Sequence, residues 1–121
     1  MHQLIEEYGK QTISELLDLI FICEHPTSEQ WKGFLIRNKL LPRTSKANIQ
    51  GDIIKIPITR ELRRNQETGR VESIPIDPYV NYQIYCKNGR GEILFKAFFT
   101  SKMLDQIKKE LYENETNQNH E

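Results

Sequence analysis

The sequence predicts an α+β domain with an N-terminal αα-hairpin, a three- to four-stranded, mostly antiparallel sheet and a C-terminal helix that packs on the sheet. Three observations carry this prediction. Apolar residues recur at helical spacing near the N-terminus, two apolar runs flank Asn88-Gly89, and a second helical stripe follows Ser101. With 121 residues, the chain can bury one core. We therefore expect one domain over residues 1–112 and a polar, disordered tail over 113–121.

The N-terminal segment is expected to form two helices. The first follows the apolar stripe of residues 4–21, which Gly9 interrupts and a capping-box pattern at Thr12 restarts. Thr27 or Ser28 is expected to cap a second helix over about residues 29–40. A short proline-containing turn joins the two.

Two isoleucine-rich stretches, 52–58 and 71–76, are expected to be short strands. Each contains a proline, Pro57 or Pro75, which cannot donate a ladder hydrogen bond and so favours a sheet edge. The segment 59–70 between them is too polar to bury and is expected to be a basic excursion rather than a strand. The expected order is therefore α-α-β-β-β-β-α.

The segment 79–100 contains the strongest hairpin signal, because Asn88 and Gly89 both tolerate the positive φ of a two-residue turn. That turn would pair Ile84 with Ile93 on an apolar inner face. A three-residue loop through residues 89–91 would shift the register and is the alternative. The outer face would carry four large apolar or aromatic side chains: Tyr79, Tyr85, Leu94 and Phe98.

The net charge is zero, but the charges are unevenly distributed. Residues 1–31 carry six acids and one base, residues 32–109 sixteen bases and seven acids, and residues 110–121 four acids and no base. The densest basic stretch is 32–70, with ten bases against three acids. Such asymmetry indicates a surface for a polyanion or an acidic protein, although solvated basic loops would give the same count.

Side chains of two kinds are expected to bind nucleic acid or a charged partner. Arginine and lysine suit phosphates, and aromatic rings on an exposed strand face can stack on bases. The expected binding residues are Lys32, Arg37, Lys39, Arg43, Lys46, Arg60, Arg63, Arg64, Arg70, Lys87, Arg90, Lys96, Tyr79, Tyr85 and Phe98.

The sequence contains no recognisable catalytic or metal-binding set. Cys23 and His25 would supply two ligands where zinc needs three or four, and Cys86 is expected to face the core. Glu92 and Lys96 lie roughly 13 Å apart along one expected strand, too far for a carboxylate-and-lysine nuclease site. We therefore expect no catalytic residue, metal or cofactor, and lean against an enzyme.

The favoured interpretation is a small non-enzymatic nucleic-acid-associated protein, regulatory or accessory, that binds DNA or RNA through a basic surface formed by the second helix and the 59–70 excursion. The alternative is a protein-binding module or small inhibitor of the kind that mobile elements and phages encode, docking a charged partner. A nuclease-like enzyme is the third. Few cysteines and no long apolar run predict a cytoplasmic protein without membrane contact, and an apolar outer sheet face allows a homodimer.

Overall fold

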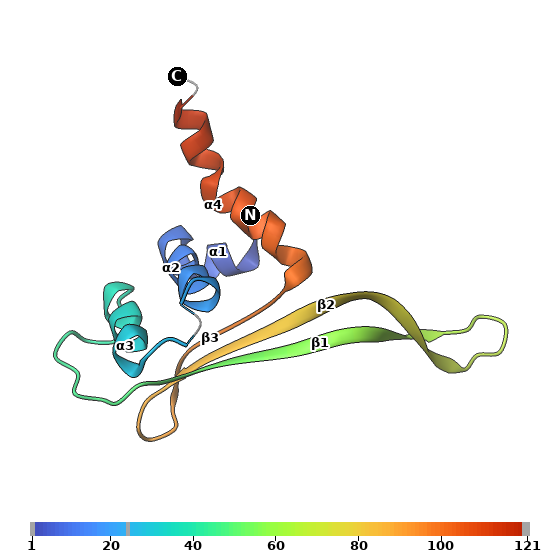
Figure 1. The fold of residues 1–121 in the computed structure, drawn as a ribbon, viewed down its shortest axis with the longest axis horizontal. Helices are drawn as coiled ribbons and strands as arrows, with labels where there is room; N and C mark the ends of the chain where they lie inside the picture. Colours follow the sequence, from blue (N-terminus) through green and yellow to red (C-terminus); the bar gives the residue numbers. More distant parts are fainter. Residues whose placement is uncertain (1, 24, 120–121) are drawn as a thin grey trace.

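A computed structural model describes residues 2–23 and 25–119, with side chains described as far as Tyr112. Figure 1 shows helices gathered on one side of a sheet and a ribbon of two strands that extends far past them. This arrangement confirms the α+β prediction. The elements in chain order are α1 (Gln3–Tyr8), α2 (Lys10–Phe21), α3 (Ser28–Arg37), β1 (Gln50–Arg64), β2 (Val71–Lys87), β3 (Ile93–Thr100), a 3₁₀ turn (Ser101–Met103) and α4 (Leu104–Asn119).

The helix boundaries follow local capping chemistry. Gly9, at φ 90°, separates α1 from α2 in a conformation that favours glycine. Thr27 caps α3, because its side chain accepts from the Gln30 N–H while the Gln30 side chain accepts from the Thr27 N–H. The capping box expected at Thr12 is wrong: Thr12 lies inside α2, and its hydroxyl donates to Asn38 Oδ1 at 2.8 Å.

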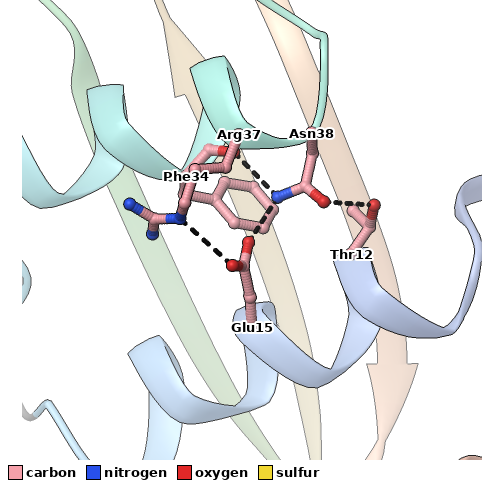
Figure 2. A network of polar contacts seen from close by, with 5 residues as sticks. All are labelled: Thr12, Glu15, Phe34, Arg37 and Asn38. Carbon is pink, nitrogen blue, oxygen red and sulfur yellow. Dashed lines mark hydrogen bonds and ion pairs between the residues drawn. The ribbon is translucent and has the colours of Figure 1, made fainter.

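A polar network joins α2 to α3 at one edge of their interface, as Figure 2 shows. The Glu15 carboxylate accepts hydrogen bonds from Arg37 Nε, at 3.1 Å, and from Asn38 Nδ2. The same Asn38 nitrogen donates to the Phe34 carbonyl oxygen at 2.8 Å. Together with the Thr12 hydroxyl, these groups fix the end of α3 against α2. Arg37 therefore has a structural partner.

The core lies between the helices and one face of the sheet. Trp31 of α3 packs on β1 at Gly51, where a Cβ atom would overlap the indole ring at Nε1. Phe34 meets Phe95 of β3 with ring centroids 5.3 Å apart. The most deeply buried residues come from α2, α3, β2 and α4: Ile13, Leu16, Trp31, Phe34, Leu35, Ile84, Cys86 and Ile107.

The sheet has three antiparallel strands in the order β1-β2-β3, so the expected four-strand order is wrong. The stretches 71–76 and 79–87 form one 17-residue strand, β2. The two stretches are joined at a β-bulge. Ile58 pairs with Tyr79 and Arg60 pairs with Pro75, so one β1 residue, Thr59, lies opposite three residues of β2. The prolines of β2 are tolerated because β2 is flanked there by β1 alone, and a two-stranded ribbon leaves half its N–H positions facing solvent.

The basic excursion is the end of a β-ribbon, which corrects the expectation of a loop. Residues 59–64 continue β1, and residues 65–70 form the turn, closed by the Gly69 N–H donating to the Asn65 carbonyl at 2.7 Å. β3 pairs with β2 only over residues 81–87, so the rest of β2 pairs with β1 alone. We call residues 59–76 the arm (Figure 1). Its polarity excludes burial but not strand pairing, since a ribbon satisfies its backbone without a core.

The β2–β3 register also differs from the expectation. Ile84 pairs with Ala97 instead of Ile93, a shift of four positions. The connecting turn is longer than two residues, because the Asn88 side chain accepts from backbone N–H groups as far along as Glu92, at 3.0 Å. An even shift leaves the paired side chains of residues 95–99 on their expected faces. At the irregularity beside Cys86 the prediction is wrong: Ile93, expected on the inner face, pairs with Lys87 and is 51% exposed, and Leu94, expected on the outer face, packs against the core.

The C-terminal helix packs on the core through Ile107 and Leu111, as the helical stripe predicts, while Tyr112 is 51% exposed. The backbone of residues 113–119 continues α4, and residues 120–121 lie outside the described part. Disorder of the segment 113–121 stays a prediction. Within the described residues, the helices are too short or too polar to cross a membrane.

Gly51→Ala should destabilise the fold by about 1–3 kcal/mol, because the new methyl group would overlap the buried Trp31 indole. Chemical denaturation measures this change. Gly89→Ala is the control, since no atom lies within 4 Å of its Cβ position, and it should stay within about 0.5 kcal/mol of the parent. Equal stabilities of the two variants would contradict the packing described.

Candidate nucleic-acid interface

Within the described part of the chain, the helices lie on one side of the sheet and none of them covers its other face (Figure 1). The aromatic contacts of α1, α2 and α3 with the sheet are all made with the inner face, for example Phe21 with Tyr82 at 5.4 Å and Tyr8 with Phe95 at 4.8 Å between centroids. Figure 1 shows the three helices on the same side. On the other side, which we call the open face, strand alternation and register place Gln50, Asp52, Ile54, Ile56, Ile58, Tyr79, Asn81, Gln83, Tyr85, Lys87, Lys96, Phe98 and Thr100.

The open face continues onto the arm. Its residues on β1 are Arg60, Leu62 and Arg64, which alternate in step with Ile54 and Ile56. Opposite them on β2 lie Pro75, Ser73 and Val71. At Thr59, β2 has two more residues than β1 between the paired positions. Because two is an even number, side chains on either side of this irregularity still alternate between the same two faces. The twist of the ribbon turns this face gradually along its length.

Charge on the arm is separated by face. Residues 59–76 contain four bases and three acids, so the arm as a whole has little net positive charge. However, the strand positions of the open face carry two arginines and no acid. Both acids of the paired strands, Glu61 and Glu72, lie on the opposite face with Arg63. Arg63 Nη2 lies 3.1 Å from the Glu61 carboxylate, so its charge is compensated.

The two arginines of this face are held differently. Arg60 donates from Nε to the Ser73 hydroxyl and from Nη2 to the Ser73 carbonyl, both at 2.8 Å. These bonds hold its guanidinium across the ribbon against Ser73. Arg64 is exposed, and no ion pair joins it to the other described side chains. Beside them, Leu62 is 72% and Val71 is 58% exposed.

The aromatic residues of the open face are partly engaged within the protein. Tyr85 meets Phe98 edge-on with centroids 5.6 Å apart. The Lys102 ammonium lies 4.4 Å from the centre of the Tyr79 ring and covers one of its faces. Tyr79 and Tyr85 are half-buried, whereas Phe98 is exposed. Lys102 was missed from the sequence because it follows β3 in a short 3₁₀ turn.

The structure brings seven of the expected binding residues onto the open face: Arg60, Arg64, Tyr79, Tyr85, Lys87, Lys96 and Phe98. The others lie elsewhere. Lys32 and Arg37 belong to α3 on the covered side, and Lys39, Arg43 and Lys46 to the segment after α3. Arg70 and Arg90 lie in the turns, and Arg63 faces away. The expected joint surface of α3 and the basic excursion is therefore not formed as one face.

The described part of the chain also contains residues with reactive or metal-binding side chains. Cys86 is fully buried in the core, and burial, with a smaller contribution from Asp52, raises the pKa of its thiol to about 12. Its neutral thiol is a poor nucleophile. Among the side chains of residues 2–23 and 25–112, no three His, Cys, Asp or Glu groups come together to hold a metal ion.

Comparisons of the chain with protein-family models, curated proteins and solved structures find no match.

The two thiols should differ sharply in reactivity. Near pH 9.0, the ordinary thiol pKa, Cys86 stays neutral because its own pKa is about 12, and it is also shielded from reagent. A thiol-titrating reagent should therefore modify half-buried Cys23 in the folded protein and reach Cys86 only on unfolding. In Cys23→Ser, rapid modification of the folded protein would contradict the burial of Cys86.

Proposed function

We propose that this chain is a small non-enzymatic protein that binds nucleic acid on the open face, as a regulatory or accessory factor. The observation that carries the proposal is the separation of charge on the arm, where arginines and exposed apolar side chains share the side that no helix covers. An arginine without a carboxylate partner is suited to phosphate, because its planar guanidinium donates in a fixed fork.

The sheet extends this surface beyond the arm. Lys96 of β3 lies opposite Tyr85 of β2, and Lys87 lies at the end of the same face. Among the paired positions on this side, Asp52 is the acid that accompanies these four bases. A nucleic-acid backbone that lies along the open face would meet positive charge on the arm and again on the sheet. Between these two regions it would cross an apolar stretch. Phosphate contacts of this kind make affinity depend on salt.

A protein-binding module is the second candidate, and Ile54 and Ile56 favour it. They are 41% and 38% exposed, lie two residues apart on the edge strand β1, and carry no charge. An apolar row on a sheet edge can receive a second protein, including another copy of this chain. The arginines of the arm would have no role in such contacts, which separates the two candidates experimentally.

Reversing the charge of the arm should abolish nucleic-acid binding at moderate salt. Arg60→Glu/Arg64→Glu removes two cations that would each neutralise a phosphate, so the slope of log affinity against log salt should fall by roughly 2. Fluorescence anisotropy with a labelled mixed-sequence duplex and a single strand, over a salt series, measures both quantities.

Lys32→Glu/Lys46→Glu is the matched control, because it makes the same change in net charge on and after α3. It should retain most of the affinity and the salt slope. Equal losses in the two variants would show a nonspecific charge effect, and no binding by the parent protein at low salt would refute the proposed function.

A further inference from the structure

We infer that the open face of the arm enters the major groove of duplex DNA and contacts base edges there. This inference rests on the proposed function and specifies the nucleic acid that is bound: B-form duplex DNA, rather than RNA or a single strand. The residues involved are Arg60, Leu62 and Arg64 of β1, with Val71 and Ser73 of β2.

The dimensions of the arm fit that groove. Its two strands are roughly 5 Å apart, and a B-DNA major groove about 12 Å wide admits a two-stranded ribbon. The six steps from Ile58 to Arg64 span roughly 20 Å, about the rise of six base pairs. The major groove of an A-form RNA duplex is too deep and narrow for side chains to read. The shape of the arm therefore favours DNA.

The spacing of the side chains also matches the duplex. Arg60, Leu62 and Arg64 follow each other every second residue, at about 6.6 Å, close to two base-pair steps. Arg60 and Arg64 would hold phosphates, as in the proposed function, and the apolar side chain between them is suited to the methyl group of thymine. Leu62 is 72% exposed, a large apolar surface that the protein itself leaves in water.

The aromatic residues of the open face are poorly placed to bind a single strand. Proteins that bind single-stranded nucleic acid stack its bases on free aromatic rings. Here one face of Tyr79 is covered by Lys102, and Tyr85 packs edge-on against Phe98. The most exposed apolar side chains of the arm, Leu62 and Val71, are aliphatic and cannot stack.

The first test compares a DNA duplex, an RNA duplex and a DNA single strand of the same mixed sequence, each about two helical turns long. We expect the DNA duplex to bind at least about tenfold more tightly than the other two. Equal binding, or a preference for RNA or the single strand, would overturn this inference and leave the proposed function standing. Absence of binding to all three would refute both.

The second test isolates Leu62 with a DNA duplex in which deoxyuridine, lacking the methyl group, replaces every thymine. The parent protein should bind this duplex roughly fourfold more weakly for each thymine methyl group that Leu62 buries. Leu62→Ala should bind the thymine duplex more weakly and no longer distinguish the two duplexes.

Ile74→Ala is the control, since Ile74 lies opposite Glu61 on the other face of the arm, and this variant should discriminate as the parent does. Unchanged discrimination in Leu62→Ala, or none in the parent, would overturn the base-edge contact. Because Leu62 is mostly in solvent, its truncation leaves the core intact.

Discussion

The contact between Trp31 and Gly51 is the constraint on which the arrangement depends. A large buried indole lies directly on the backbone of β1, and only glycine leaves room for it. This contact docks α3 on the inner face, and the polar network around Glu15 then ties α3 to α2. The helices of the described residues thus pack on one side of the sheet, and the opposite side stays open (Figure 1).

That one-sided packing explains why the arm can exist. β1 passes beneath α3 and continues beyond the helices, where β2 is the strand that pairs with it. Outside the core, residues need only strand pairing, so polar side chains can occupy both faces of the ribbon. Because successive side chains of a strand point to opposite faces, the ion pair of Glu61 and Arg63 lies on one face of the ribbon. Arg60 and Arg64 lie on the other face. A nearly neutral segment thus acquires a basic face.

The sequence predicts those features that depend on local chemistry. Gly9 and Thr27 mark helix boundaries, and alternation identifies the inner face correctly except at Ile93, which the irregularity beside Cys86 displaces. The register could not be predicted, because it depends on how far the Asn88 side chain reaches across its turn. The arm was missed because its polarity resembles that of a loop, and charge separation by face becomes visible only when Arg60 and Arg63 are placed on paired strands.

The most direct test of the nucleic-acid surface is an NMR titration of the intact chain with a mixed-sequence DNA duplex, following the backbone amide signals. We expect the largest changes in chemical shift on residues 60–64 and 71–73 of the arm and on the open face around Lys96 and Phe98. Changes concentrated on α3 and residues 38–46, with the arm unaffected, would contradict the proposed surface.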